Sequence, residues 1–335
     1  MPAQMRSFQI SSPIALSSIR NFILTEGRSE DAVIMRDLVA ARQAIHERFA
    51  PELAQDPVYI QSTIDIGYGR YNACLAHFVP WLHRYYNHLT PQVLVEIGAG
   101  TGSSTAAFAR MCGEITGYDF DESALEFART RIERLGVRNA RLVGLGPEGA
   151  IAAIQREHPD GVDGIILYAV LEHMTADERI EMISGLWSLL RQGGCFLVGE
   201  TPNRLSYLDH HTTGLPFFNM LNEDLALRYY HKTTRQDVIR SIDAGLAQGK
   251  ESGRLALIRT GYSGASYHEF ELALGENYAS YVVSTPDDPE IMGVYGDHSA
   301  EVNALKSYVA SKGLNVHPCF LEAYLLFILR KPLEG

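Results

Sequence analysis

Between residues 93 and 201, short apolar runs rich in β-branched residues alternate with longer segments that have helical periodicity. The strands are predicted at residues 93–97, 114–119, 140–145, 163–169 and 195–201. The helices between them are predicted at residues 103–111, 122–135, 148–157 and 176–190. Because such alternation is typical of parallel sheets, we predict an α/β fold with a doubly wound, mostly parallel sheet and helices on both faces. Right-handed crossovers bring the carboxyl ends of the strands to one edge, where a ligand is expected.

The rest of the chain is organised around this core. Four regions are expected, with boundaries at residues 1–90, 91–203, 204–262 and 263–335. The first is an N-terminal helical lid or substrate region, the second the ligand-binding core, and the third a helical cap inserted after the fifth strand. The predicted helices outside the core lie at residues 33–49 and 71–86, from Glu223 onward, and at 234–246. Two last strands, at 267–274 and 320–330, would complete a seven-stranded sheet.

The composition of the chain argues against nucleic acids and membranes as partners. The 335-residue chain has a formal net charge of -11 and no cluster of Lys and Arg, so a nucleic-acid partner is not expected. No apolar run approaches the ~20 residues that span a bilayer, and the first residues do not read as a signal peptide. Four scattered cysteines without a CxxC pair suit reduced thiols. We therefore expect a soluble, cytoplasmic protein that acts on a small molecule, with no membrane association. The oligomeric state does not follow from the sequence.

The first predicted strand ends in a glycine-rich loop, Glu96-Ile-Gly-Ala-Gly-Thr-Gly102. Glycines at this place let backbone amides approach a ligand and let the next helix begin without steric conflict. A dinucleotide fingerprint GxGxxG would need glycine at the position of Ser103, and no Gly-Lys-Ser/Thr follows to make a P-loop. The spacing therefore favours a nucleotide-type ligand of another class, bound beside a carboxylate.

The second predicted strand ends in a further acid, Asp119, followed by Phe120. A carboxylate at this strand end can accept hydrogen bonds from both hydroxyls of a ribose, and an aromatic ring next to it can pack on a base. Asp121 and Glu122 suit the N-terminus of the next helix. Asp119 alone is equally consistent with a helix cap, but together with the glycine loop it favours ribose binding.

These residues and three later segments resemble the class I S-adenosylmethionine-dependent methyltransferases, whose core is Rossmann-like. The segments are Val162 to His173, which ends in Leu-Glu-His, Leu189 to Val198, which contains a Gly-Gly turn, and Glu200-Thr-Pro-Asn203. The resemblance covers about residues 93–203 and the two predicted last strands. It implies a methyltransferase with S-adenosyl-L-methionine as cofactor, acting on a small molecule.

The resemblance also implies roles for individual residues. The residues expected under the methionine part of the cofactor are Gly98, Ala99, Gly100, Thr101 and Gly102. Glu96 would reach the amino end, Asp119 the ribose hydroxyls and Phe120 the adenine. Tyr168 and Ala169 would lie near the sulfonium methyl. The family usually has an Asp that contacts the adenine amino group, but residues 142–146 read Leu-Val-Gly-Leu-Gly, so that contact must be made in another way.

Catalysis requires little beyond orientation, because the sulfonium is already a good leaving group. Transfer to an oxygen benefits from a general base, and histidine is suited to that role near neutral pH. The candidate catalytic residues are His173, His210 and His211, each with a structural alternative as a cap or loop hydrogen bond. His268, which falls on a predicted strand, is expected to be structural.

Two further sites have competing interpretations. Arg70 is expected to pair with the cofactor carboxylate or an acidic substrate, although a surface ion pair explains it equally well. Some related enzymes bind a divalent ion through Glu-x-x-Glu-His and a later histidine. Here Ala169 replaces the first acid, so no metal is expected, although Glu172, His173 and His210 leave that possibility open.

The sequence supports one function best and leaves others open. O-methylation of a hydroxyl or carboxylate, assisted by a histidine base, is the preferred hypothesis. N-methylation of a small molecule is the first alternative. A nucleotide-dependent oxidoreductase would bind NAD instead, and a non-catalytic methyltransferase-like binding protein would have no need of the complete set of Glu96, the three loop glycines and Asp119.

Overall fold

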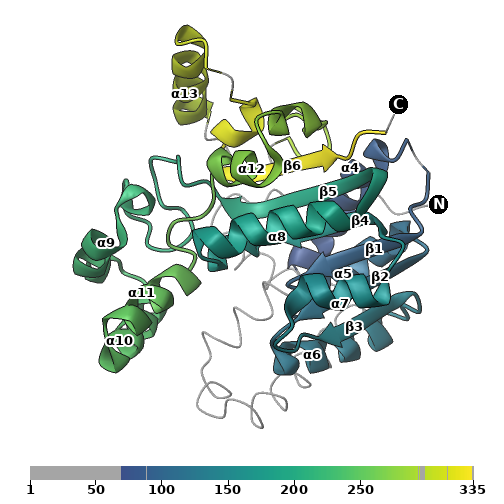
Figure 1. The fold of residues 1–335 in the computed structure, drawn as a ribbon. Coiled ribbons are helices and arrows are strands. Elements are labelled where there is room, and N and C mark those ends of the chain that lie inside the picture. Colours follow the sequence, from purple (N-terminus) through teal and green to yellow (C-terminus); the bar gives the residue numbers. More distant parts are fainter. Residues whose placement is uncertain (1–68, 88, 293, 295–298, 315, 334–335) are drawn as a thin grey trace, which may run out of the picture. The chain divides into compact units, whose positions relative to one another are not determined.

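The computed structural model describes residues 69–87, 89–292, 294, 299–314 and 316–333 (Figure 1). The predicted helix at 33–49 lies outside these residues, and the division into four regions stays a prediction. By its contacts the chain forms two compact units. Of the described residues, unit 1 comprises those up to Ile165 together with those within 287–297, and unit 2 comprises Ile166–Pro286 with the remaining C-terminal ones.

Unit 1 contains three parallel strands, β1 (Val93–Ile97), β2 (Glu114–Asp119) and β3 (Ala140–Gly144). In the register of β1 and β2, Glu96 lies opposite Gly117. Among the described residues of this unit, the helices and turns are η1 (Cys74–Phe78), α4 (Val79–Tyr85), α5 (Ser103–Phe108), η2 (Ala109–Met111), α6 (Glu122–Arg134) and α7 (Gly149–Glu157). The Asp121 side chain accepts hydrogen bonds from two backbone amides at the start of α6, as predicted for a cap.

Strand β4 (Val162–Tyr168) runs across the boundary between the units, and β5 (Leu190–Pro202) and β6 (Tyr324–Arg330) belong to unit 2. The six strands follow the order β3-β2-β1-β4-β5-β6, and β6 is antiparallel to β5. Helix α8 (Ala176–Leu189) lies along β5 (Figure 1) and begins at a capping box made by Thr175 and Glu178. The predicted α/β fold with a mostly parallel sheet is confirmed, with six strands in the described part of the chain.

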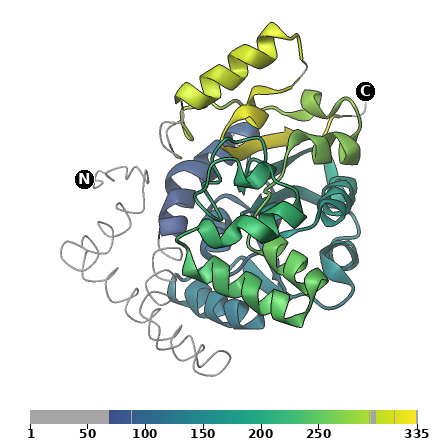
Figure 2. The ribbon, with the colours of Figure 1, turned by 90° about the vertical axis from the view of Figure 1, so that its left-hand side faces the viewer.

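The inserted segment after β5 is helical, as predicted. Its helices are α9 (Glu223–Tyr229), α10 (Gln236–Gln248) and α11 (Lys250–Arg259), and α10 and α11 lie side by side (Figure 2). They enclose a small core of their own, in which the rings of Phe218 and Tyr262 are 5.5 Å apart. The other short elements of unit 2 are η3 (Leu171–His173), η4 (Phe218–Met220), η5 (Tyr230–Lys232), η6 (Tyr278–Tyr281), α13 (Ser299–Ser311) and η7 (Pro318–Leu321).

One predicted strand is wrong. Residues 267–274 form a helix, α12 (Tyr267–Leu274), because Ser266 and Glu269 make a capping box and Gly275 ends the helix. Phe270 is buried and Leu272 exposed, which fits an alternating strand poorly but suits the turn of a helix. The sheet therefore lacks the seventh strand that we expected from this segment.

The limits of three other elements differ from the predicted ones. Strand β6 begins only at Tyr324, since the residues before it form η7. Strand β5 begins at Leu190, earlier than predicted. The predicted helix at 71–86 includes a π-helical turn, η1. Within the described residues, no helix is both long and apolar enough to cross a membrane.

Candidate functional site

The glycine loop lies between β1 and α5 in unit 1. Its three glycines all have positive φ, 74° at Gly98, 49° at Gly100 and 72° at Gly102. Only glycine adopts these angles without strain, so the loop has this shape because the sequence places glycine at each turn. A Cβ at Gly100 would meet nothing closer than the Gly98 carbonyl at 3.9 Å, which leaves the loop open on that side. A ligand can therefore approach the backbone at Gly100.

Gly102 has a second reason to be glycine. A Cβ built there would lie 2.8 Å from the Ala128 Cβ on α6. We expect Gly102→Ala to lower the free energy of unfolding by about 2 kcal/mol, because it adds both an unfavourable φ and a steric clash. Gly136→Ala is the matched control: its φ of 63° is similar and nothing lies within 4 Å, so about 1 kcal/mol is expected. Urea unfolding measures both, and equal losses would contradict the packing role.

Asp119 links the end of β2 to the glycine loop. Its Oδ2 accepts a hydrogen bond from the Gly100 amide at 2.7 Å, and its Oδ1 accepts one from the Asp121 amide at 2.9 Å. Burial raises the pKa of Asp119 above its ordinary value, and these hydrogen bonds act in the opposite direction. The cap of α6 is made by Asp121, whereas Asp119 orients the glycine loop. Next to it, the Phe120 side chain is 68% exposed.

Glu96 is the buried acid of this unit. It is fully buried in β1, and its Oε2 accepts a hydrogen bond from the Thr105 hydroxyl. Burial raises the pKa of Glu96 to about 7, while hydrogen bonds from Ser104 and Thr105 and the positive charge of Arg70 lower it. Among the described residues, no group donates a hydrogen bond to its Oε1. A buried carboxylate with a raised pKa and one oxygen without a hydrogen-bond donor suits a cationic donor such as an ammonium group.

The structure therefore links four of the predicted cofactor residues of unit 1, Arg70, Glu96, Gly100 and Asp119, through charge interactions and a hydrogen bond. Arg70 acts on Glu96 through its charge, and Asp119 holds the loop at Gly100. Ala99 is buried, and its amide donates to the Tyr118 carbonyl at 3.1 Å. The carbonyl of Thr101 accepts a hydrogen bond from the Arg131 guanidinium at 2.8 Å, which attaches the loop to α6. Tyr68, two residues before Arg70 in the sequence, lies outside the described residues.

Unit 2 holds the two residues predicted near the sulfonium. Tyr168 is 1% exposed at the end of β4, and Ala169 adopts a φ of 57°, which is unusual for a residue with a side chain. The Ala169 amide donates to the Gly199 carbonyl at 2.9 Å. Such strained backbone is common at functional sites. The roles of these residues stay predictions.

The predicted catalytic histidines separate into a pair and a single residue. The rings of His173 and His211 are 5.9 Å apart, whereas the His210 ring lies beside Tyr324 at 6.4 Å. A third residue, Glu172, lies next to this pair; the sequence analysis named it only as a possible metal ligand. This side chain is 0% exposed, and its Oε1 is 3.8 Å from Nε2 of His173. Its position next to His173 was the available signal.

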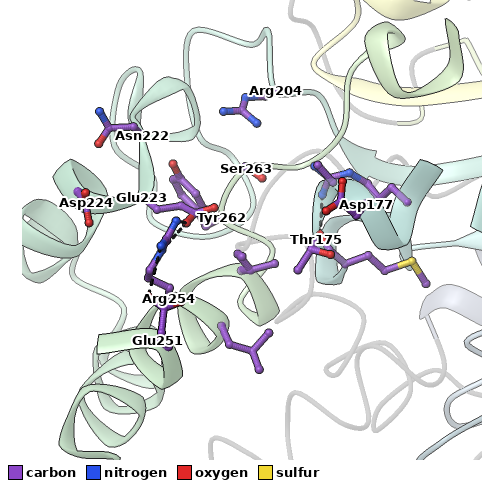
Figure 3. Close-up of a pocket in the computed structure, with 15 residues that line it drawn as sticks. Thr175, Asp177, Arg204, Asn222, Glu223, Asp224, Glu251, Arg254, Tyr262 and Ser263 are labelled. Atoms are coloured by element: carbon purple, nitrogen blue, oxygen red, sulfur yellow. Dashed lines mark hydrogen bonds and ion pairs between the residues drawn. The ribbon is translucent and has the colours of Figure 1, made fainter. Parts of the chain in front are cut away.

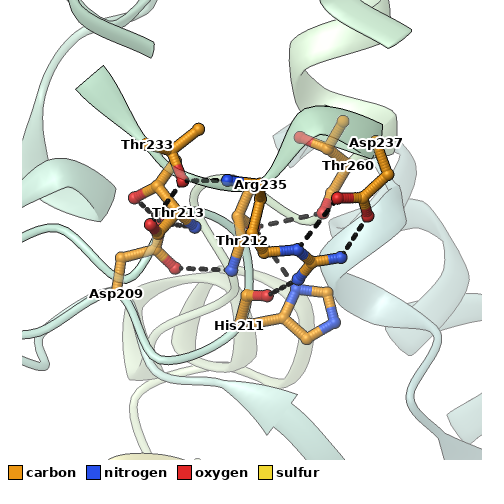
Figure 4. Close-up of polar contacts among 8 residues, drawn as sticks. All are labelled: Asp209, His211, Thr212, Thr213, Thr233, Arg235, Asp237 and Thr260. Carbon is orange, nitrogen blue, oxygen red and sulfur yellow. Dashed lines mark hydrogen bonds and ion pairs between the residues drawn. The ribbon is translucent and has the colours of Figure 1, made fainter. Parts of the chain in front are cut away.

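The loop that carries His211 is held by polar contacts (Figure 4). The Asp209 carboxylate accepts hydrogen bonds from the amides of Thr212 and Thr213, at 2.9 and 2.8 Å. Arg235 donates to the His211 carbonyl at 2.7 Å, and the Thr212 hydroxyl donates to the Thr260 carbonyl at 3.1 Å. The backbone on both sides of the imidazole is therefore fixed.

His268 lies elsewhere. It is exposed on α12, stacks on Tyr267 at 3.9 Å, and has its Nδ1 3.0 Å from the Ser266 hydroxyl. The prediction that His268 lies on a strand is wrong, because the residue lies on helix α12.

A cavity of about 600 Å³ lies in unit 2 (Figure 3). It opens beside the residues that follow His173 in the chain, and α9 and α11 form another wall. The residues that line it are Met174, Thr175, Ala176, Asp177, Arg179, Arg204, Asn222, Glu223, Asp224, Glu251, Arg254, Leu255, Ile258, Tyr262 and Ser263. Arg254 donates to Glu223 at 2.7 Å, whereas no described residue makes a hydrogen bond or ion pair with the Arg204 guanidinium. The cavity thus offers both donors and acceptors to a polar molecule.

Comparisons with known proteins agree with the geometry of unit 1. A family profile described as a methyltransferase domain matches residues 95–196. The chain is 30% identical over 125 residues to a probable S-adenosylmethionine-dependent methyltransferase of Mycolicibacterium smegmatis, a match that covers 37% of this chain and 44% of that protein. It is 30% identical over 136 residues to a protein-L-isoaspartate O-methyltransferase of Picosynechococcus sp., which covers 39% and 57%. The chain thus matches about half the length of these relatives.

Two solved structures are among those similar to this chain. The plantazolicin methyltransferase BpumL in complex with SAH is 14% identical, covers 89% of this chain and 97% of that chain, and has a TM-score of 0.42. DesVI of Streptomyces venezuelae is 18% identical, covers 43% and 57%, and has a TM-score of 0.34. The profile match assigns a methyltransferase domain to residues 95–196, the stretch that contains the glycine loop and the acids at the ends of β1 and β2.

Proposed function

We propose that this chain binds S-adenosyl-L-methionine and transfers its methyl group to an oxygen of a small molecule. The observation that carries the proposal is the buried Glu96 carboxylate beneath the glycine loop, whose Oε1 has no hydrogen-bond donor among the described residues. The amino group of the cofactor is the matching donor, and Asp119 would take the ribose hydroxyls. Phe120 is exposed enough to cover an adenine ring. The residues of unit 1 therefore fit the cofactor.

When bound, S-adenosyl-L-methionine would supply a methyl group on a sulfonium sulfur. The acceptor oxygen would take this methyl group as the carbon–sulfur bond breaks and would lose its own proton, with S-adenosylhomocysteine as the second product. The protein must align the acceptor and assist that proton loss. We propose that the pair His173 and His211 provides this assistance, since His210 packs beside Tyr324.

We propose that the acceptor enters the cavity of unit 2, whose lining includes Met174, the residue that follows His173 in the chain. Its lining mixes carboxylates, arginines and hydroxyl groups with apolar contacts from Leu255 and Ile258. This mixture suits a small polar molecule that carries hydroxyl groups. The net charge of -11 and the absence of a basic cluster in the sequence support a partner other than nucleic acid, and the buried cysteines support a reducing, cytoplasmic location.

Calorimetric titration of the purified full chain tests the cofactor. We expect saturable binding of S-adenosylmethionine and S-adenosylhomocysteine at one site per chain, and no binding of NAD. Binding of NAD in place of the adenosyl ligands would favour the oxidoreductase. Failure of all three ligands to bind a folded chain would contradict the proposal.

The acceptor atom is tested by the product. A methyl group carried on oxygen gives an ether or an ester, and an ester is cleaved by mild base whereas an ether and an N-methyl amine are not. Mass spectrometry of the products from a panel of hydroxylated, carboxylated and amino acceptors therefore separates the hypotheses. Products methylated on nitrogen alone would replace O-methylation by N-methylation, the first alternative.

A further inference from the structure

Three metal-ligand side chains converge in unit 2 at the cluster Glu172–His173–His211. One donor atom from each lies within 4.8 Å of the other two. The set consists of two imidazoles and one carboxylate, and it comes from η3 and from the loop after β5. Residues distant in sequence thus present nitrogen and oxygen donors to one point.

The hydrogen bond of His173 determines which ring nitrogen faces this point. Its Nδ1 is 2.8 Å from the carbonyl oxygen of Arg259. Because a carbonyl oxygen only accepts, Nδ1 carries the proton, and in the neutral ring the lone pair is on Nε2. A backbone carbonyl in this position is the usual way in which proteins orient a metal-binding histidine.

The separation between His173 and Glu172 fits an intervening cation. Nε2 of His173 is 3.8 Å from Oε1 of Glu172, which is too far for a direct hydrogen bond. Glu172 is completely buried, and a buried carboxylate attracts a nearby cation more strongly than an exposed one does. The other carboxylate oxygen, Oε2, is 3.4 Å from the Thr201 hydroxyl, which orients the group. A cation between the two side chains would take Oε1 of Glu172 and Nε2 of His173 as ligands.

The His211 ring packs against the backbone of Gly261. A Cβ at Gly261 would lie 2.6 Å from both Cε1 and Nδ1 of the His211 ring, and 3.3 Å from Cγ of Glu172. The glycine, with a φ of 85°, therefore makes room for the ring and the carboxylate together. Polar contacts of the neighbouring backbone fix the loop on either side, so the ring is positioned before any ion arrives.

We propose that this cluster binds one divalent transition-metal ion, with Zn²⁺ as the first candidate. Two histidines and one glutamate form a ligand set of catalytic zinc sites, in which a fourth position stays open for water or substrate. Mg²⁺ and Ca²⁺ prefer several oxygen ligands and fit this donor set poorly. A tetrahedral ion with bonds of roughly 2.0–2.2 Å places its donors about 3.4 Å apart, so side-chain rotation suffices to close the site.

The site departs from the expectation of no metal, which rested on Ala169. His211 supplies a third ligand, so an acid at that position is not needed. A catalytic role of the metal ion rests on the proposed function. An acceptor hydroxyl bound at the open position of the ion would lose its proton more easily. The two histidines would then assist the reaction as ligands of the ion. The binding of the ion itself stands on the geometry alone.

The test is a titration of the full chain, first dialysed against EDTA and then against metal-free buffer. Calorimetry with Zn²⁺, Co²⁺ and Mg²⁺ is expected to give one tight site for the first two and none for Mg²⁺. Co²⁺ is expected to add visible absorption bands of tetrahedral coordination. His173→Ala and His211→Ala should each weaken Zn²⁺ binding at least about 100-fold, since outer-sphere partners alone are worth 10–100-fold.

The controls are His231→Ala and His268→Ala, both exposed and outside the cluster, which should leave the affinity unchanged. Glu172→Gln keeps the shape of the side chain, and circular dichroism of every variant verifies the fold. Zn²⁺ binding that survives in both cluster variants, or is lost equally in the controls, would overturn the site.

Titration with S-adenosylhomocysteine on the same EDTA-treated sample separates the two proposals. If the chain binds S-adenosylhomocysteine but not Zn²⁺, the metal site alone is contradicted. Zn²⁺ binding without binding of the adenosyl ligands would remove the proposed function and leave the metal site.

Discussion

Asp119→Ala is expected to weaken binding of S-adenosylhomocysteine at least about 100-fold. The carboxylate would accept two hydrogen bonds from the ribose, and a hydrogen bond to a charged group contributes about 1.5–3 kcal/mol. The same substitution removes the acceptor of the Gly100 amide, which lies 2.7 Å from Oδ2 and orients the glycine loop. Calorimetry or equilibrium dialysis measures the change.

The matched control is Asp121→Ala, two residues away. Its side chain caps α6, so the variant should lose about 1 kcal/mol of stability and keep its affinity for the ligand. Asp119→Asn retains an acceptor for the Gly100 amide but loses the charge, and an intermediate affinity is expected. If Asp119→Ala bound S-adenosylhomocysteine as tightly as Asp121→Ala, the ribose assignment would fail.

Glu96 makes the stability of the unliganded chain depend on pH. Burial raises its pKa from the ordinary 4.5 to about 7, so the folded chain binds this proton more tightly than the unfolded chain. The contribution of protonated Glu96 is complete below pH 4.5 and is lost as the pH rises through about 7. A shift of this size corresponds to about 3 kcal/mol.

Glu96→Gln isolates this contribution, because glutamine resembles the protonated acid. Urea unfolding at pH 5 and at pH 8 is expected to show that the wild type loses about 3 kcal/mol more than the variant between the two pH values. If the free energy of unfolding depended on pH equally in the two proteins, a group other than Glu96 would cause the change.

Cofactor binding should depend on pH in the opposite direction to the stability of the unliganded chain. Its ammonium group favours ionised Glu96, so binding of S-adenosylhomocysteine should tighten as the pH rises through about 7 and should release a proton. Calorimetry in buffers of different ionisation enthalpy counts that proton. In Glu96→Gln the affinity should be lower at pH 8 and independent of pH in this range.

Much of the core follows from local sequence. β1 and β2 have the predicted bounds, and the positive φ angles of the loop glycines explain why those residues were visible in the sequence as a motif. A motif of this kind is compact because strand, turn and helix follow one another in the chain. The resemblance to methyltransferases rested on the same stretch, which the family profile matches at residues 95–196.

The errors have a different origin. The stretch from Tyr267 to Leu274 alternates and carries aromatic residues, which favours a strand, yet the interaction of Ser266 with Glu269 starts a helix. The apolar character of such a short segment does not distinguish the two, and the cap decided between them.

Local periodicity and turn chemistry therefore sufficed for the α/β class, the glycine loop and the acids at the ends of β1 and β2, because each of these depends on residues close together in the chain. The effect of the Arg70 charge on Glu96 and the grouping of Glu172 and His173 with His211 depend on the tertiary fold. Such contacts leave no spacing signature in one sequence, since any loop length that closes the distance will serve.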